Sequence, residues 1–310
     1  MKVRLGYACI SKTLDITTSK TYTYTKYKET KDNKKLEEII EQNLHNLIEI
    51  LKYNIKNNIH FYRLSSNIIP LATHKEVNIN YLDKYKKYYK TISNLINKNN
   101  LRVDLHASPY CILNSTKKEV IENTMASLKY YYNLLNIMNI KNKLVILHIG
   151  SNEFGKKNSL TRFINNFKLL PKHIQDIIAI ENDDKTFTID DCLSIREKIN
   201  IKIVLDYHHF LCNNTNNNIE DYLKEIFNTW ENITPKIHFS SPKNKKEHRA
   251  HNDYIEVESF IKFIDICQKY NKDIDIMLEA KEKDEALFRL IRQLKYLTNY
   301  NFIDESTFIP

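Results

Sequence analysis

Short apolar runs rich in β-branched residues alternate with longer segments of helical spacing along the entire chain of 310 residues. Each run has the length and composition of a buried β-strand. There are eight such runs: Val3 to Ala8, Ile59 to Leu64, Leu101 to Ala107, Leu144 to Ile149, Ile177 to Ile180, Ile201 to Leu205, Lys236 to Phe239 and Ile274 to Leu278. This alternation constrains the fold more than any other feature, because repeated strand–helix units build parallel sheets.

The segments between the runs carry apolar residues three, four and seven positions apart, which is the spacing of one helical face. The pattern is clear at 33–55, 116–140, 257–264 and 287–294, and weaker at 80–98, 158–170, 189–198 and 219–230. Eight strands alternating with eight helices predict an α/β protein with a single-domain (β/α)8 TIM barrel, a fold of about 250 residues. A doubly wound open sheet is the alternative, since it uses the same units.

The barrel domain is expected to span residues 1–298, followed by a C-terminal tail at 299–310. Only three glycines are present, and neither GxGxxG nor GxxxxGK[ST] occurs, which excludes the glycine-rich phosphate loops of nucleotide-cofactor proteins. Five cysteines without a CxxC spacing are typical of reduced thiols in an intracellular protein. No segment approaches the roughly 18 apolar residues of a membrane span, so no membrane partner is expected.

The net charge is +9, from 47 Lys and Arg against 38 Asp and Glu. A basic surplus of this size favours a polyanionic partner such as a nucleic acid. An AT-rich coding sequence, which favours Lys, Asn, Ile and Tyr, would give the same surplus. The charge therefore does not identify a partner without a site to which it belongs.

Residues of the kind that bind metal ions stand at or just after the C-terminal ends of the apolar runs. In a barrel these ends meet at one face, where the active sites of this fold lie. One histidine at a strand end is more often structural, but six runs end in this way, at His106, His148, Glu181, Asp206, His238 and Glu279. Tyr7, His74, His208, His209 and His251 lie nearby in the sequence. We therefore expect these residues to share one pocket.

Imidazole nitrogens and carboxylate oxygens together suit zinc, manganese or iron. The ligands are too numerous for one four-coordinate ion, so two or three divalent ions are expected, with a carboxylate such as Glu181 bridging them. Paired ions activate water and stabilise the entering and leaving oxygens of phosphoryl transfer. The residues themselves thus favour phosphodiester hydrolysis. His208 and His209 are adjacent, and only one of them is expected to bind an ion.

Nine sequence blocks resemble, in order and over nearly the whole chain, those of the UV damage endonuclease family. The blocks are Gly6-Tyr7, Thr17-Thr18, Arg63-Leu64-Ser65-Ser66 with Pro70 and His74, Leu147-His148-Ile149-Gly150, Ile180-Glu181-Asn182-Asp183-Asp184, Asp206-Tyr207-His208-His209, Lys236-Ile237-His238-Phe239-Ser240-Ser241-Pro242, His251-Asn252-Asp253-Tyr254-Ile255 and Asp275-Ile276-Met277-Leu278-Glu279-Ala280-Lys281. The resemblance implies a TIM-barrel DNA repair enzyme, related to apurinic endonucleases, that cuts duplex DNA 5′ to UV photoproducts.

By position in these blocks, the resemblance implies a first ion at His106, His148 and Glu181. A second ion would share Glu181 and take Asp206, His238 and Glu279, and a third would take His209 and His251. Manganese is the expected metal, with zinc, magnesium or cobalt as alternatives. Lys236 stands where the family has a lysine that points at the metals and can be carboxylated. Glu181, Lys236 and His74 form the expected catalytic set.

Two blocks depart from the family pattern at residues expected to contact DNA. Where the family commonly has Gln followed by an aromatic residue, this chain has Pro109-Tyr110. Ser11 stands in place of an Asn, and Lys20 in place of an Arg. Tyr110 is expected to fill the gap left by a damaged base, and Tyr7 to stack on a flipped base. The departures leave every expected metal ligand in place.

The expected reaction is the hydrolysis of damaged double-stranded DNA at cyclobutane dimers and 6-4 photoproducts by a monomer, leaving a 3′-hydroxyl and a 5′-phosphate. Damaged bases pair poorly and cost less to extrude, which supplies part of the selectivity. Three alternatives stay open at this point: an apurinic/apyrimidinic endonuclease, a sugar isomerase on a similar metal barrel, and a DNA-binding scaffold with structural metals.

Overall fold

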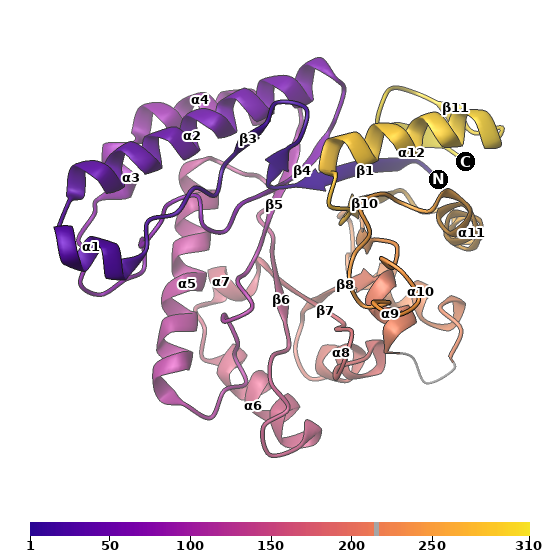
Figure 1. Ribbon diagram of the computed structural model, residues 1–310. Helices are drawn as coiled ribbons and strands as arrows, with labels where there is room; N and C mark the ends of the chain where they lie inside the picture. Colours follow the sequence, from indigo (N-terminus) through magenta and orange to yellow (C-terminus); the bar gives the residue numbers. More distant parts are fainter. Residues whose placement is uncertain (214–216) are drawn as a thin grey trace.

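The computed structural model describes residues 1–213 and 217–310 and contains a closed barrel of eight parallel strands. Neighbouring strands follow the order β1-β4-β5-β6-β7-β8-β9-β10, and β10 pairs with β1 to close the ring (Figure 1). The strands are β1 (Val3–Ala8), β4 (Phe61–Leu64), β5 (Arg102–His106), β6 (Val145–His148), β7 (Ile178–Glu181), β8 (Lys202–Asp206), β9 (Lys236–Phe239) and β10 (Ile274–Leu278). All eight predicted runs are confirmed, and the open-sheet alternative is excluded by the closure.

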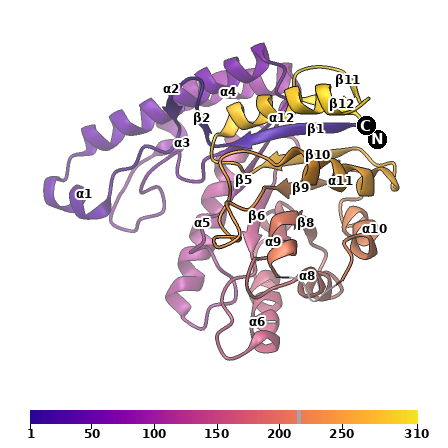
Figure 2. The ribbon, with the colours of Figure 1, turned by 45° about the vertical axis from the view of Figure 1, so that its right-hand side comes forward.

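The helices lie between the strands in sequence and surround the barrel, as Figures 1 and 2 show. The eight predicted helical segments correspond to α2 (Asn33–Lys56), α3 (Tyr81–Lys84) with α4 (Lys86–Lys98), α5 (Lys118–Ile137), α6 (Lys156–Lys168), α8 (Ile189–Arg196), α10 (Glu220–Asn228), α11 (Val257–Gln268) and α12 (Lys283–Leu297). The sequence patterns did not predict α1 (Tyr24–Thr30), α7 (Lys172–Gln175) or α9 (Tyr207–Cys212). These three are seven residues long or shorter, too short for an amphipathic period to show.

Most of the apolar core lies between the strands and the surrounding helices. Leu5 and Tyr7 of β1, for example, belong to the same buried cluster as Leu47 and Leu51 of α2. A smaller apolar cluster, formed by Leu144, Ile146, Ala179, Val204 and Trp230, is separate from it. Alternate residues of a strand point to opposite sides, so each strand contributes to both the outer layer and the barrel interior.

Charged side chains are buried within the strands as well. Asp275 is fully buried and pairs with Arg4 and Arg102, each at 2.6 Å. Lys236 is also fully buried, and its Nζ lies 2.6 Å from Asp104 Oδ2. Buried charges persist only when paired, and these pairs supply the partners.

The C-terminal segment joins the sheet instead of leaving it. Its strands β11 (Asn301–Phe302) and β12 (Thr307–Ile309) form a hairpin, and β12 runs antiparallel to the start of β1. Phe308 is fully buried and stacks on Tyr300, with ring centroids 5.3 Å apart. The two termini therefore lie together in both views (Figures 1 and 2). The division at residue 298 into a domain and a tail stays a prediction.

A further small hairpin, β2 (Ile10–Ser11) with β3 (Ile16–Thr17), follows β1. Its turn is held by Asp284 at the start of α12, which accepts hydrogen bonds from Ser11 Oγ at 3.0 Å and from the backbone N–H of Lys12 at 2.7 Å. The hydroxyl of Tyr53 on α2 donates to the same carboxylate at 2.9 Å. One buried carboxylate thus joins three elements.

Candidate metal centre

The strand-end residues predicted from the sequence converge at one end of the barrel. His106, His148, Glu181 and Asp206 are the last residues of β5, β6, β7 and β8, and Glu279 follows β10 directly. The parallel register places neighbours side by side: His148 is opposite Glu181, and Asp206 is opposite His238 of β9. Neighbouring parallel strands lie about 4.8 Å apart, so this register brings imidazole and carboxylate groups within ligand distance of a shared ion.

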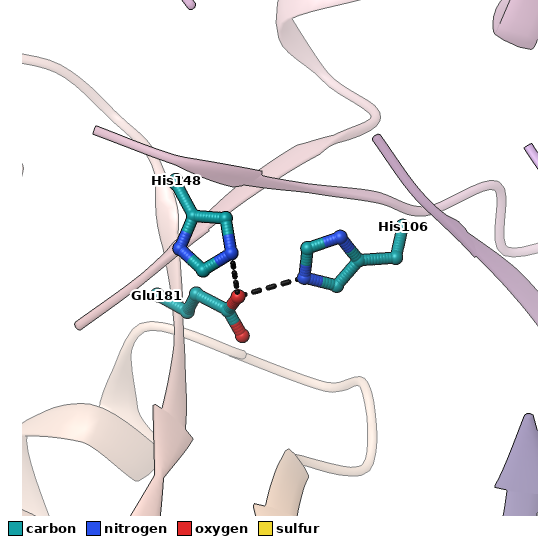
Figure 3. Close-up of side chains that lie close together, drawn as sticks. All are labelled: His106, His148 and Glu181. Carbon is teal, nitrogen blue, oxygen red and sulfur yellow. Dashed lines mark hydrogen bonds and ion pairs between the residues drawn. The ribbon is translucent and has the colours of Figure 1, made fainter. Parts of the chain in front are cut away.

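Glu181 lies at the centre of the cluster and is 1% exposed. Its Oε1 is 2.7 Å from His106 Nε2 and 2.9 Å from His148 Nε2 (Figure 3). Its Oε2 is 2.7 Å from His238 Nδ1. One carboxylate therefore faces two imidazoles with one oxygen and a third imidazole with the other, as a bridging ligand would.

A second group shares Glu181 and adds Asp206, His238 and Glu279. His238 Nδ1 lies 3.8 Å from Asp206 Oδ2 and 3.3 Å from Glu279 Oε1. Among the described residues, Glu181 Oε2 and His238 Nδ1 are buried, and although they lie 2.7 Å apart they are not aligned for a hydrogen bond with each other or with another group. Buried polar atoms are rarely left in this state, and a cation between them would satisfy both. The donor set of nitrogen and carboxylate oxygen thus fits divalent metal ions in two overlapping groups.

The charges of these groups depend on each other. Burial raises the pKa of Glu181, but His106, His148 and His238 outweigh it and hold this pKa well below its usual range. Burial lowers the pKa of His148, but Glu181 outweighs it and raises this pKa to about 9. Burial and the charge of Arg63 lower the pKa of His238 to about 3. Glu181 is therefore anionic and His238 neutral near pH 7, as metal ligands must be.

Asp206 differs, because burial raises its pKa above the usual range in spite of the nearby His209. A cation bound nearby would stabilise the ionised form of Asp206 and lower this pKa. The mouth of the centre is a cavity of about 320 Å³ lined by the first predicted group, by Glu181 and Glu279 of the second, and by residues of neighbouring strands and loops. Its lining consists of Arg63, His106, His148, Glu181, Asp184, His209, Arg249, His251 and Glu279.

His209 and His251, the residues expected to bind a third ion, line this cavity with ring centroids 6.2 Å apart. Each has one ring nitrogen fixed by a carbonyl: His209 Nδ1 lies 3.0 Å from Asn182 O, and His251 Nδ1 lies 3.0 Å from Glu279 O. A carbonyl partner of this kind commonly orients a metal-binding imidazole. His208 is buried instead, with Nε2 3.8 Å from Cys212 Sγ, and does not line the cavity.

The expected catalytic set does not lie together. Glu181 is in the centre, whereas Lys236 Nζ is paired with Asp104 inside the barrel. Burial lowers the pKa of Lys236 to about 7, although Asp104 opposes this shift. His74 lies on the loop after β4, where its ring stacks on that of Tyr24 with the ring centroids 3.7 Å apart. It is not part of the cavity lining. A role for His74 in the chemistry therefore lacks support from its position.

Two residues expected to contact DNA are core residues in this structure. Tyr7 is fully buried, and its hydroxyl donates to Asn54 Oδ1 of α2 at 2.7 Å. Ser11 is fully buried against Asp284. Neither side chain has accessible surface, so the structure does not support stacking of Tyr7 on a flipped base or a contact of Ser11 with DNA. Tyr7 packs in the layer between strands and helices, an orientation that a motif match does not reveal.

The other expected DNA contacts are accessible. Lys20 and Pro109 are exposed, and Tyr110 is 87% exposed on the loop after β5. Of the basic residues near the mouth, Arg249 is bound to Asp184 at 2.6 Å. Lys245 and Lys246 lie exposed on the loop after β9.

Arg63 also lines the centre, although the sequence motifs indicated no role for it. It comes from β4, is 7% exposed, and contacts Glu279 and His238 directly. The sequence signal that could have identified it is an arginine within an otherwise apolar strand, Phe61–Leu64.

Within the described residues, no helix is long and apolar enough to cross a membrane.

Three comparisons place the chain among known proteins. The family model described as UV-endonuclease UvdE matches residues 3–308. The UV DNA damage endonuclease of Bacillus cereus (strain B4264) is 40% identical over 301 residues, which cover 95% of each chain. The solved structure of SacUVDE superimposes with a TM-score of 0.87 at 33% identity and covers 95% of this chain and 99% of its own. Endonuclease IV from Thermus thermophilus, at a TM-score of 0.57 and 12% identity, covers 94% of this chain and 99% of its own and shows the fold alone.

Proposed function

The chain belongs to the UV-endonuclease family, and we propose that it is a metal-dependent repair enzyme that hydrolyses duplex DNA immediately 5′ to UV photoproducts. The observation that carries this proposal is the buried pair of ligand atoms, Glu181 Oε2 and His238 Nδ1, which lie 2.7 Å apart at the C-terminal end of the barrel strands and are not aligned for a hydrogen bond. The products would be a 3′-hydroxyl and a 5′-phosphate. The protein would act as a monomer inside the cell, where its DNA substrate is.

We propose that one divalent ion is held by His106, His148 and Glu181, and a second by Glu181, Asp206, His238 and Glu279. A third would be held by His209 and His251, and manganese is the expected metal. Such ions supply positive charge that lowers the pKa of the attacking water and neutralises charge on the phosphoryl oxygens. Glu181 keeps the two groups together, because each of its oxygens faces a different set of imidazoles.

The protein's own residues would orient the substrate. Lys245 and Lys246 are exposed on a loop at the same end of the barrel as the centre and would contact phosphates without reading the base sequence. Tyr110 would occupy the space that a damaged base leaves in the stack, because its ring is almost fully accessible. The likeness to UV DNA damage endonucleases supports photoproducts as the lesions.

A second candidate, cleavage at abasic sites, is favoured by one observation. Pro109 occupies the position at which the family commonly has the glutamine next to the aromatic residue. Proline has no side-chain hydrogen-bonding group, so it cannot replace that contact with a base. Lesion preference could therefore differ from that of the family while the metal ligands stay the same.

The proposal is tested by incision of matched duplexes that carry a cyclobutane dimer, a 6-4 photoproduct, an abasic analogue or no lesion. The chelated protein is assayed with and without added Mn²⁺. Cutting 5′ to both photoproducts that requires the metal supports the proposal. Cutting of the abasic duplex alone would favour the second candidate, and the absence of any incision would favour a sugar isomerase.

The Glu181→Gln variant separates an enzyme from a DNA-binding scaffold. Loss of the bridging charge should reduce incision by at least about 100-fold, the scale on which groups around a metal change activity, while DNA binding stays near that of the wild type. The matched control is Glu305→Gln, an exposed glutamate of the C-terminal hairpin at the opposite end of the barrel. Unchanged incision by the Glu181 variant would contradict the metal centre.

A further inference from the structure

Arg63 places a positive charge inside the proposed second cation site. Its Nη1 is 2.6 Å from Glu279 Oε1, and its Nη2 is 2.7 Å from His238 Nε2. Both partners belong to the residues proposed to hold the second ion. On its other side, Arg63 Nε lies 3.9 Å from Asp104 Oδ1, which has no hydrogen-bond partner among the described residues. The guanidinium is therefore between the proposed cation site and a second carboxylate.

The contact with His238 determines which ring nitrogen carries the hydrogen. A guanidinium has N–H donors and no acceptor, so His238 Nε2 must accept from Arg63. In a neutral imidazole the hydrogen is then on Nδ1. This is the nitrogen that faces Glu181 Oε2 at 2.7 Å and Glu279 Oε1 at 3.3 Å. The lone pair that a metal ion would need on Nδ1 is therefore not available while Arg63 holds Nε2.

A cation bound at Nδ1 would require the opposite arrangement. The hydrogen would be on Nε2 and would point at the N–H of Arg63, so that two donors would face each other. Arg63 would also have to give up Glu279, because the ion needs the same oxygen. The nearby Asp104 offers the guanidinium another carboxylate, although it already pairs with Lys236.

We propose that Arg63 is a positioning residue that competes with the second divalent ion for His238 and Glu279. In the metal-free protein, the guanidinium offsets the negative charge of Glu279 and fixes the His238 tautomer. When the ion binds, the guanidinium moves toward Asp104 and the hydrogen of His238 moves to Nε2. Among the described residues, no guanidinium contacts His106 or His148 of the first ion's site, so the two sites differ in affinity. This inference rests on the proposed metal centre and adds the residue that sets its order of filling.

The first test is the binding of Mn²⁺, measured by calorimetry and by electron paramagnetic resonance, to the wild type, Arg63→Met and Arg102→Met. Methionine is apolar and of similar length, so it removes the charge and the donors while filling the space. We expect the weaker ion to bind about tenfold more tightly to Arg63→Met, the scale on which groups behind the ligands change affinity. A weaker or an unchanged affinity would overturn the inference.

Arg102→Met is the matched control. Arg102 is also a largely buried strand arginine, bound to Asp275 at 2.6 Å and to the carbonyl of Thr234 at 2.7 Å. It has no contact with the proposed ligands, so its replacement should leave both Mn²⁺ affinities unchanged. An equal gain in both variants would assign the effect to net charge and not to competition, and would also overturn the inference.

A second test needs no Arg63 variant and remains valid if Arg63→Met does not fold. Nitrogen-15 imidazole spectra of the wild type report which nitrogen of His238 carries the hydrogen, with the resonance assigned by its loss in His238→Gln. We expect hydrogen on Nδ1 in the metal-free protein and on Nε2 after addition of diamagnetic Zn²⁺. Hydrogen on Nε2 in the metal-free protein would overturn the inference.

The outcomes separate this inference from the proposed function. Two bound ions with unchanged affinities in Arg63→Met would overturn the competition and leave the metal-dependent nuclease intact. A single ion in both the wild type and Arg63→Met would overturn the competition together with the two-ion arrangement. Incision of photoproduct duplexes, measured separately, decides the reaction itself.

Discussion

At the scale of single residues, the candidate centre consists of ionisable side chains that are buried at the end of the barrel. Glu181, Asp206 and His238 are each 1% exposed or less. A buried charge without a partner costs several kcal/mol, and pairing recovers this cost only when the geometry is good. Glu181 obtains its partners from three imidazoles on three other strands. The stability of this carboxylate thus depends on side chains that are far apart in the sequence.

His148 leads to a prediction on pH. Because Glu181 raises the pKa of His148 to about 9 in the metal-free protein, this imidazole still carries its proton near pH 7. A metal ion must displace that proton, so the apparent affinity should rise with pH up to about pH 9, by about tenfold per pH unit for one displaced proton. Mn²⁺ isotherms at several pH values measure this slope.

The control for this prediction is His45→Gln, because His45 is exposed on α2 away from the centre. Its slope should equal that of the wild type. An affinity that is independent of pH between 7 and 9 would show that His148 binds no proton in the metal-free protein.

Tyr110 carries a prediction about lesion recognition. Its side chain is 87% exposed, so Tyr110→Ala should leave folding unchanged and remove a stacking surface for DNA. Stacking of one base on an aromatic ring contributes about 1–3 kcal/mol, so incision of a photoproduct duplex at low DNA concentration should fall about tenfold or more. Steady-state incision rates give the value.

Tyr296→Ala serves as the comparison, because Tyr296 is 88% exposed but lies on α12, near its C-terminal end. Its replacement should have no effect on incision. An equal loss in both variants, or a loss in neither, would remove Tyr110 from the recognition of damaged DNA.

At the scale of elements, the barrel strands and the β2–β3 hairpin are determined by different interactions. The strands follow from their apolar, β-branched runs, and the register of parallel neighbours follows from closure of the barrel. The hairpin of β2 and β3 depends instead on one carboxylate, that of Asp284 on α12. Nothing in the local sequence of residues 10–17 indicates that partner, which is about 270 residues away.

Asp284→Asn tests this connection. The amide would place a donor against donors from Ser11, Lys12 and Tyr53, which now all give hydrogen bonds to the carboxylate. A buried group left unpaired in this way costs about 1–3 kcal/mol. Equilibrium unfolding in urea should show a loss of unfolding free energy of this size.

Asp176→Asn is the matched substitution on the surface, because Asp176 pairs with Lys172 and its side chain is 54% exposed. It should change the unfolding free energy by less than about 0.5 kcal/mol. A similar small effect in Asp284→Asn would mean that the β2–β3 hairpin is not held by α12.

At the scale of the whole molecule, part of the positive charge that gives the net value of +9 lies at the end of the barrel that holds the candidate centre. The centre opens at the end of the barrel to which the exposed Lys245 and Lys246 belong. Neutralising both in Lys245→Gln/Lys246→Gln should weaken binding to damaged and undamaged duplexes alike. It should also reduce the dependence of the logarithm of affinity on the logarithm of salt concentration by up to about 2 units, if each lysine releases one counterion. Fluorescence anisotropy over a salt series provides the slope.

The control pair, Lys141→Gln/Lys198→Gln, removes the same charge at the opposite end, because these exposed lysines precede β6 and β8. Its salt dependence should stay close to that of the wild type. Equal slopes for the two double variants would mean that the face bearing the candidate metal centre is not the face that binds DNA.

The sequence by itself determined the barrel and most of the residues that line the candidate metal centre. Apolar runs with a repeating spacing specify strands and helices locally, and the C-terminal ends of parallel strands must share one face. His106, His148, Glu181, Asp206 and Glu279 could therefore be predicted to meet without coordinates, and the cluster confirms that they lie together.

Only the tertiary structure decided which way the remaining side chains point. Tyr7 is close to the strand end in sequence but packs on α2, while Arg63 turns into the centre and contacts two of its proposed ligands. His74 stacks on Tyr24 outside the cavity, and residues 301–309 form two strands that no pattern predicted. The reason is physical: a periodic pattern fixes the direction of the backbone, but a side chain adopts the orientation in which distant partners satisfy its charge or cover its surface.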